Sequence, residues 1–426
     1  MAVVICAAFV IFALAGVPLA FSFGLASLAG LIWSGMSFNI LAEKMVFSVN
    51  SFPLMAIPFF MLAGELMVAG GIMSRLVALT NSIVGNIRGG LAQGTVLSGV
   101  GLATVSGTAV ADAAALSSAV GRPLQEAYGR PFSSAVIAAS ANFGPIIPPS
   151  TPMIIYATIA GNLVSISDLF LAGILPGLMI ACMMLLLINI LARLRGFERT
   201  GSPFSLKLFF QRLREAALVI LMPIIVIGGI VTGAFTPTEG GAIAVTYSLL
   251  AGFFLTRQLT FAALPRVFLR AIVTTAVVGA LIALASPLTF LFAISGVPRA
   301  IGGALQAITA DPTLFLLIIF AVLLVVGMFV ESATAYILFV PVLAPIAVTY
   351  GIDPLHFGMV FILTIVLGMM TPPIGALLFV MSGINNVKIG EISRQLLPFI
   401  SIHLAVIIAI IFIPEIVTFL PDLARN

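Results

Sequence analysis

The sequence has 426 residues, of which 62% are hydrophobic and only 8% are charged, and its mean hydropathy is +1.28. Soluble globular domains carry roughly 25% charged residues, so this composition excludes a water-soluble protein and predicts a membrane protein. The net charge of +4 does not indicate a nucleic-acid partner. A third of the basic residues lie in one short central segment, and an excess of basic residues in a short loop is typical of the cytoplasmic loops of membrane proteins.

Long apolar stretches run through the chain and predict α-helices that cross a membrane. Most approach or exceed the roughly 20 residues that a helix needs to span the hydrocarbon core, and their summed length predicts roughly ten to twelve crossings. They do not alternate between apolar and polar residues, as the strands of a membrane β-barrel would. The clearest stretches are 3–31, 54–68, 171–194, 216–231, 314–330 and 400–413.

The first half of the chain, residues 1–192, is interrupted twice by small, polar and proline residues. The apolar run 91–105 ends at the Ser-Gly-Thr sequence of 106–108, and we predict a helical hairpin over 91–125 with its tip at this sequence. Further along, residues 142–150 read NFGPIIPPS. A Pro-Pro pair cannot continue a helix, so we predict a broken helix there.

A basic linker, residues 193–215, connects the two halves. Lysine and arginine are enriched in the cytoplasmic loops of membrane proteins, so the linker is predicted to face the cytoplasm. Its basic residues are Arg193, Arg195, Arg199, Lys207, Arg212 and Arg214.

The second half, residues 216–426, repeats the order of the first. The apolar run 314–330 meets a Glu-Ser-Ala-Thr sequence, which predicts a second hairpin over 314–350, and a second Pro-Pro pair predicts a broken helix around 368–375. Matched interruptions in two halves are typical of a secondary transporter built from a repeat, with its binding site where the helices break. If the amino terminus is periplasmic and the linker cytoplasmic, each half crosses an odd number of times and the repeats are inverted.

Backbone groups freed at a helix break must find partners inside the protein or on a polar cargo. Carbonyl and hydroxyl oxygens at such breaks can surround a sodium ion, and this chain has few carboxylates to do so. We therefore predict two sodium sites. The first comprises Ser106, Gly107, Thr108, Asn142, Gly144 and Pro145, and the second comprises Gly327, Ser332, Thr334, Gly368, Met369 and Thr371.

Four residues are predicted to contact the substrate: Ser106, Asp112, Ser150 and Glu331. Asp112 and Glu331 are acids in apolar surroundings, where burying a charge is costly and usually reflects function. The alternatives are that Ser106 packs between helices, that Asp112 accepts local donors, and that Ser150 caps the next helix.

Two further acids have structural readings. Glu239 follows Thr236 and Pro237 in the pattern of a capping box, so a structural role is predicted for it. Glu65 lies in an apolar helix. The sequence does not decide whether it pairs with Arg75 or contacts another subunit.

Five segments occur in an order that resembles one known family across nearly the whole chain. With them the chain resembles the large, DctM-like membrane subunit of TRAP (tripartite ATP-independent periplasmic) transporters, which are related to other ion-coupled elevator transporters. The segments are AIPFFMLAGE at 56–65, SGTAVAD at 106–112, PIIPPS at 145–150, FTPTEGGA at 235–242 and MTPPIG at 370–375.

The resemblance implies an all-α polytopic membrane protein of the bacterial inner membrane, an inverted-repeat elevator transporter in which two helical hairpins and two broken helices move against a scaffold. It implies import of a small carboxylate, such as a dicarboxylate, sialic acid or another sugar acid, with Na+ as the coupling ion. A periplasmic binding protein would deliver the substrate, and a small DctQ-like membrane subunit would brace this chain within the membrane lipid. Glu331 stands where family members often carry Asp, which leaves the substrate open.

Other classes of protein fit the sequence less well. An enzyme is not predicted, because no histidine or lysine base accompanies Ser106 in the sequence and no metal-ligand cluster is present. No phosphate-binding loop is present, so ATP is not the direct energy source. An ion channel would not need the paired breaks. The closest alternative is an ion-coupled organic-anion transporter that works without a binding protein.

Overall fold

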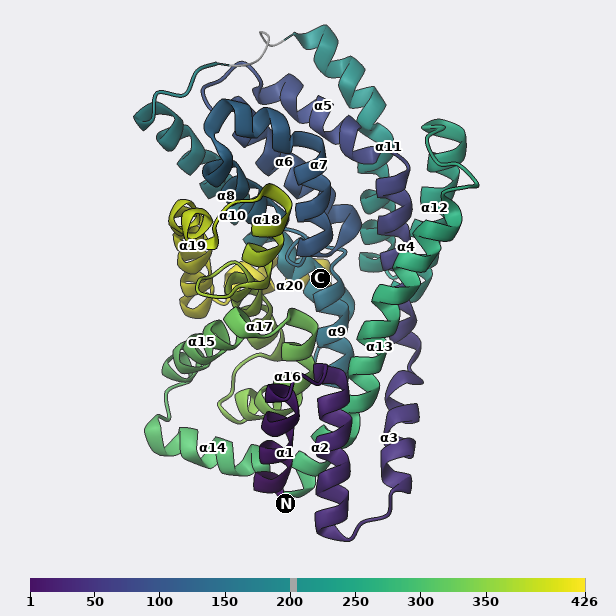
Figure 1. Ribbon diagram of the computed structural model, residues 1–426, viewed down its shortest axis with the longest axis vertical. Helices are drawn as coiled ribbons and strands as arrows, with labels where there is room; N and C mark the ends of the chain where they lie inside the picture. Colours follow the sequence, from purple (N-terminus) through teal and green to yellow (C-terminus); the bar gives the residue numbers. More distant parts are fainter. Residues whose placement is uncertain (200–204, 426) are drawn as a thin grey trace.

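The structure is a computed structural model that describes residues 1–199 and 205–425, and within these residues every regular element is a helix (Figure 1). The prediction of an all-α polytopic membrane protein is therefore confirmed. Seven described helices are long and apolar enough to cross a membrane, or eight if the bent pair Leu206–Ala217 and Val219–Val231 forms one span. The estimate of ten to twelve crossings is higher because much of the apolar length lies in helices of 10–17 residues.

The outer layer contains the helices that come before the first hairpin and those between the basic linker and the second hairpin. Helix α4 packs on both α12 and α13, and α2 packs on α13, so the two sets of helices form one scaffold. In Figure 1 its helices α3, α4, α11, α12 and α13 lie on the right, and α1, α2 and α14 lie at the bottom. Its helices are α1 (Ala2–Leu14), α2 (Leu19–Ser34), α3 (Asn39–Val49), η1 (Phe52–Met55), α4 (Ala56–Ala69), α5 (Ile72–Val84), α11 (Leu206–Val231), α12 (Pro237–Leu250), η3 (Ala251–Leu255), α13 (Leu264–Ile294) and α14 (Val297–Ile308).

The remaining helices form an inner body that contains both hairpins and both breaks. The hairpins are α6 (Gly90–Ser106) with α7 (Ala109–Tyr128), and α15 (Pro312–Phe329) with α16 (Ser332–Thr349). Contacts of α9 with α16 and of α8 with α19 join the parts that lie before and after the linker. The other helices are α8 (Arg130–Ala141), α9 (Thr151–Ala160), η2 (Gly161–Leu163), α10 (Ile166–Leu194), α17 (Pro354–Met369), α18 (Ala376–Asn385), α19 (Ile389–Phe412) and α20 (Glu415–Arg425).

The two hairpins approach the middle of the molecule from opposite ends. Helices α6 and α7 occupy the upper part of Figure 1 and α15 and α16 the lower part, and residues from both tips line the same cavity. The first turn depends on Gly107, whose φ of +65° is the left-handed conformation that glycine adopts without strain. A Cβ there would also lie 2.9 Å from the carbonyl oxygen of Pro149, so the hairpin tip rests directly on the first break.

Both predicted breaks are present at the Pro-Pro pairs. Helix α8 ends at Ala141 and α9 begins at Thr151, while α17 ends at Met369 and α18 begins at Ala376. Proline removes a backbone donor and clashes with the preceding turn, which explains why neither apolar segment continues as one helix. The fold therefore has two helical hairpins and two broken helices, as the sequence predicts.

The capping box at the start of α12 is confirmed. The Thr236 hydroxyl accepts from the Glu239 amide at 3.3 Å, and the Glu239 carboxylate accepts from the Thr236 amide at 2.7 Å. Glu65 lies 3.9 Å from Arg270, whereas Arg75 donates to the backbone carbonyl of Glu215. The suggested pairing of Glu65 with Arg75 is therefore wrong, because α13, which is distant in sequence, is the neighbour that reaches Glu65.

Within the predicted basic linker, residues 200–204 lie outside the described part of the chain. The flanking basic residues Arg193, Arg195, Arg199 and Lys207 are exposed, as expected for charges that remain in water or among lipid headgroups. Their cytoplasmic location remains a prediction.

We expect a cysteine at Glu198 to resist a membrane-impermeant maleimide in intact spheroplasts and to react once the membrane is permeabilised, because the positive-inside rule places the linker in the cytoplasm. The parent should lack the exposed native cysteines Cys6 and Cys182. Ser37→Cys is the matched probe, since this exposed residue lies in the turn between α2 and α3 at the other end of the molecule. Rapid labelling at residue 198 with protection at residue 37 would reverse the topology.

Candidate substrate and ion site

A cavity of about 430 Å³ lies where the two hairpin tips meet the first break and the scaffold. The inner body contributes the start of α7, the residues around the first break, the start of α16 and the end of α17. The scaffold contributes α4 and α13. The lining residues are Met61, Thr108, Ala109, Val110, Ala111, Ala114, Pro145, Thr151, Pro152, Ile155, Thr274, Val277, Val278, Leu281, Glu331, Ser332, Ala333 and Met369.

The cavity is mainly apolar with a few polar groups, which is the usual character of a small-molecule site. Its polar side chains are four hydroxyls and the carboxylate of Glu331, and no lysine or arginine is among the described lining residues. The backbone adds to these groups, because Ala109, Val110 and Ala111 form the first turn of α7 and Thr108 provides no side-chain cap for their amides. Uncapped amides at a helix start can donate to an anion.

The tip of the first hairpin is held by a short network around Asp112. The Ser106 hydroxyl donates to Oδ1 of Asp112 and itself accepts from the Thr108 amide at 3.3 Å. Asp112 is fully buried, and its Oδ2 has no hydrogen-bond partner in the described part of the chain. A buried carboxylate oxygen with no donor or cation beside it is costly, so this atom is a candidate ligand for a cation.

The first break lies directly against this network. A Cβ on Gly144 would contact Oδ2 of Asp112 and would lie 2.9 Å from the carbonyl carbon of Thr108. Asn142, just before it, is also fully buried, and its Nδ2 donates to the carbonyl of Val366 at 3.2 Å. The Asn142 Oδ1 is a second buried oxygen without a hydrogen-bond partner among the residues described.

At the second hairpin tip, the side chain of Glu331 caps α16. Its carboxylate accepts from the Ala333 amide at 2.9 Å, the Thr334 amide at 3.4 Å and the Ser332 hydroxyl at 2.8 Å. A negative charge at this position is stabilised by the positive end of the helix dipole. The start of α16 is therefore already occupied by the chain's own carboxylate.

The second break has two converging carbonyls and one tight helix crossing. A Cβ at Gly375 would lie 2.7 Å from the Met369 carbonyl oxygen and 2.9 Å from that of Thr371, so both oxygens point toward the space that this glycine leaves. The Gly368 Cβ position lies 2.6 Å from the backbone of Gly327, which brings α15 and α17 into direct contact. The Thr371 hydroxyl donates to the Leu367 carbonyl at 2.7 Å.

The structure brings some predicted site residues together and separates others. Thr108, Pro145, Glu331, Ser332 and Met369 line the cavity. The others named for the two ion sites are at the hairpin tips and breaks but are not among the lining residues: Ser106, Gly107, Asn142, Gly144, Gly327, Thr334, Gly368 and Thr371.

Three of the four predicted substrate ligands, Ser106, Asp112 and Ser150, are not among the lining residues. Asp112 is buried against Gly144, where its free oxygen suits an ion better than a substrate. The Ser150 hydroxyl donates to the Pro145 carbonyl at 2.6 Å and accepts from the Met153 amide at 3.5 Å. Ser150 therefore caps helix α9, which is the alternative to a substrate contact that the sequence left open.

Sequence reasoning missed the scaffold side of the cavity. Met61 and Thr274 to Leu281 lie in apolar stretches of α4 and α13 that no helix break interrupts, so no break points to them. Within residues 274–281, the polar residues are Thr274 and Thr275. Thr151 was also missed, although it directly follows the Pro-Pro-Ser sequence of the first break.

A family model described as "Tripartite ATP-independent periplasmic transporter, DctM component" matches residues 5–416. The chain belongs to this family. It is the large membrane component of a TRAP transporter, a multi-pass protein of the bacterial inner membrane, and a transport protein rather than an enzyme. Members of the family work with a small membrane subunit and a periplasmic binding protein.

Several curated proteins resemble this chain over most of its length. It is 36% identical over 408 residues to the 2,3-diketo-L-gulonate TRAP transporter large permease protein YiaN of Escherichia coli, covering 94% of each. It is 34% identical over 412 residues to the sialic acid TRAP transporter large permease protein SiaM of Vibrio cholerae, covering 96% of each.

A longer relative is the isethionate TRAP transporter permease protein DctMQ of Oleidesulfovibrio alaskensis. The chain is 36% identical to it over 413 residues, which are 96% of this chain. It spans only 65% of that relative's length.

Two solved transporters share the fold at low sequence identity. The YdaH transporter of Alcanivorax borkumensis aligns with a TM-score of 0.61 and 17% identity over 88% of this chain and 87% of that one. MtrF of Neisseria gonorrhoeae aligns with a TM-score of 0.57 and 12% identity over 87% and 82% of the two chains. At these identities the likeness concerns the fold alone.

Proposed function

We propose that this TRAP permease uses a sodium gradient to import a small organic anion that a periplasmic binding protein delivers. One observation carries the proposal: both hairpin tips and the first break meet the scaffold at one small cavity, with unpartnered buried oxygens directly behind it. Cargo and coupling ions would then be held by the same pair of hairpins.

The first sodium ion is proposed to bind between the first hairpin tip and the first break. The free oxygens of Asp112 and Asn142 supply unmet acceptor capacity there, and the contact of Gly144 with the hairpin tip brings the two segments together. Carboxylate, amide and carbonyl oxygens are suitable ligands for a sodium ion, which does not need nitrogen or sulfur ligands. We therefore propose that Asp112 is a ligand of the ion, together with Ser106 and Thr108, and not a ligand of the substrate.

The second sodium ion is proposed to bind at the corresponding place in the second half. The Met369 and Thr371 carbonyls converge beside Gly375, and Ser332 and Thr334 add hydroxyls from the hairpin tip. These groups are neutral. The two sites therefore differ in charge, because the first includes a carboxylate and the second does not.

The cavity geometry also supports an elevator movement. One wall belongs to the hairpins and breaks, and the other belongs to α4 and α13 of the scaffold. If the first group moves as one body past the second, cargo that is bound at the tips moves with it. The wall that α13 forms is largely apolar, with Val277, Val278 and Leu281, so few polar contacts would oppose sliding.

The anionic part of the substrate is proposed to bind the uncapped first turn of α7, because Glu331 already occupies the start of α16. Named relatives handle isethionate, 2,3-diketo-L-gulonate and sialic acid, all of which are organic anions. With Glu331 beside the cavity, we propose that the rest of the substrate carries hydroxyl or amino groups that donate to this carboxylate.

We expect uptake into proteoliposomes to require an inward sodium gradient, the small membrane subunit and the cognate binding protein. An interior-negative potential should accelerate uptake, because two sodium ions with a monoanion carry one net charge, worth about 2.3 kcal/mol per 100 mV. Uptake of radiolabelled substrate is measured while each component is omitted in turn.

Replacing external sodium with potassium is the control for ionic strength. Undiminished uptake in potassium would contradict the sodium coupling. Uptake of free substrate without the binding protein would support the alternative, an ion-coupled organic-anion transporter that works alone.

A further inference from the structure

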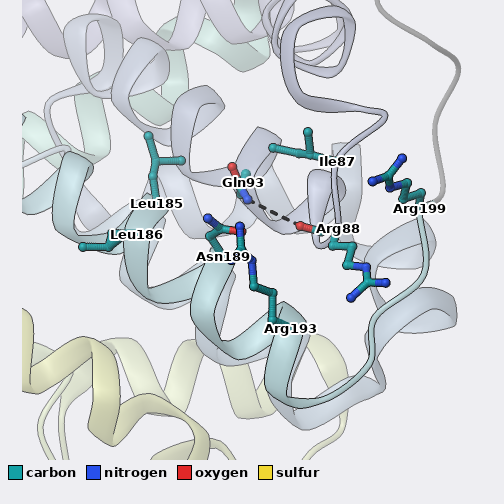
Figure 2. Close-up of a pocket in the computed structure, with 8 residues that line it drawn as sticks. All are labelled: Ile87, Arg88, Gln93, Leu185, Leu186, Asn189, Arg193 and Arg199. Atoms are coloured by element: carbon teal, nitrogen blue, oxygen red, sulfur yellow. Dashed lines mark hydrogen bonds between the residues drawn. The ribbon is translucent and has the colours of Figure 1, made fainter.

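A second cavity, of about 760 Å³, lies away from the hairpin tips, between the connection from α5 to α6 and the last turns of α10 (Figure 2). Its lining has two chemical characters. One part is strongly basic and polar, with three arginines and two amides, and the other is aliphatic. The residues are Arg88, Arg193, Arg199, Gln93, Asn189, Ile87, Leu185 and Leu186.

Among the residues that the structure describes, the three arginines have no acidic partner. None of their guanidinium groups hydrogen-bonds or ion-pairs with another residue in the described part of the chain, and the cavity lining contains no carboxylate. Arg193 and Asn189 rise from α10 toward Gln93, while Arg88 and Arg199 lie on the other side (Figure 2). Three like charges around one hollow repel each other and favour an anion between them.

The cavity lies at the level of lipid headgroups. Helix α10 has 29 residues, or about 43 Å at 1.5 Å per residue, which matches the roughly 40–45 Å of a bilayer with its headgroups. Arg193 is in the last turn of this helix. Leu186 and Ile190, which are 60% and 47% exposed, precede Arg193 in α10 and therefore lie deeper in the membrane, where they form an apolar surface directed toward lipid.

We propose that this cavity binds the phosphate headgroup of an anionic phospholipid, with its acyl chains along the surface formed by Leu186 and Ile190. Guanidinium groups match phosphate oxygens in bidentate pairs, and the side-chain amides of Asn189 and Gln93 add donors. Basic pockets between membrane helices on the cytoplasmic side suit such headgroups, since anionic lipids are held there by charge. The small subunit is the competing occupant, but nothing in the lining favours a protein over a headgroup with an attached hydrocarbon chain.

The bound lipid would connect two parts of the inner body. Arg88 lies two residues before the start of α6, at the base of the first hairpin, whereas Arg193 and Asn189 belong to α10. A phosphate between them therefore holds the base of the hairpin against α10 and screens the repulsion among the arginines.

The test titrates the purified complex with the small subunit in detergent with phosphatidylglycerol and follows bound lipid by native mass spectrometry. We expect saturable binding of phosphatidylglycerol, and an affinity at least about tenfold weaker for phosphatidylcholine and for the variant Arg88→Gln/Arg193→Gln, because charge-assisted contacts are lost. Arg193→Lys should retain part of the affinity. Arg214→Gln is the matched control, since this exposed arginine also belongs to the basic linker but lies outside the cavity.

Three results would overturn the proposal. The first is equal phosphatidylglycerol binding by wild type and the double variant, with unchanged thermal unfolding of both. The second is complete displacement of the lipid by inorganic phosphate at millimolar concentration, which would mark an anion site without a lipid preference. The third is protection of a cysteine at Asn189 from a thiol reagent by the small subunit but not by phosphatidylglycerol, which would mark a protein interface.

Discussion

Gly368→Ala is expected to abolish transport and to lower the melting temperature of the purified protein. A Cβ at residue 368 would lie 2.6 Å from both the Cα and the carbonyl carbon of Gly327. These are backbone atoms within helix α15, so no side chain can rotate away and the two helices must separate. Overpacking in a tight core typically costs about 1–3 kcal/mol, and we expect a value near the top of this range, about a hundredfold in the folding equilibrium.

The uptake rate should fall further than the loss of folded protein alone would explain, because separation of α15 from α17 also displaces the second break and the Met369 carbonyl. Initial uptake rates in proteoliposomes and thermal unfolding in detergent measure the two effects. Gly383→Ala is the matched control, since this helical glycine in α18 has no atom within 4 Å of the Cβ position. Uptake by Gly368→Ala at the wild-type rate would show that α15 and α17 have room for a methyl group at residue 368.

The hairpins and breaks could be predicted from sequence because each depends on local chemistry. Gly107 supplies a left-handed turn that few other residues adopt, and two prolines in succession end a helix wherever they occur. The capping box at Thr236 and Glu239 is local in the same way. Each of these features is decided within a few residues of chain, so its position can be read without knowing what packs around it.

The contacts between segments could not be predicted in this way. In a membrane protein an apolar helix face can meet lipid or another helix, and the sequence pattern is the same for both. Hence nothing in the sequence marks α13 as a wall of the cavity, and nothing identifies its Arg270 as the residue that lies beside Glu65. The sequence predicts Gly327 and Gly368 as part of an ion site and does not reveal the close approach of their backbones that the structure shows.

The burial of acids was only partly predictable. The sequence predicts a substrate contact for both Asp112 and Glu331, because each is an acid in apolar surroundings. In the structure Glu331 is exposed and caps its own helix, whereas Asp112 is fully buried with one free oxygen. The difference arises from their distances to the tips: Glu331 immediately precedes its helix, while Asp112 lies one turn inside α7, under the first break.

Asp112→Asn is expected to reduce sodium-driven uptake at low sodium by at least about tenfold, because the amide keeps the shape of the side chain but removes the negative charge beside the proposed ion. Rising sodium should restore only part of the rate. Ser106→Ala should act less strongly, raising the sodium concentration for half-maximal uptake by about threefold to tenfold, since a hydroxyl is one neutral ligand among several. Both are measured as uptake against external sodium at saturating substrate and binding protein.

A purely structural role for Asp112 gives a different result. The Ser106 hydroxyl donates to Oδ1, so a structural network would lose stability on either change and the loss would not depend on sodium. Thermal unfolding measured with and without sodium separates the two roles: if Asp112 binds the ion, sodium raises the melting temperature of wild type but not of Asp112→Asn. Ser118→Ala, at an exposed position of the same helix, is the control for substitutions in α7. A sodium-dependent shift that is the same in wild type and Asp112→Asn would remove Asp112 from the ion site.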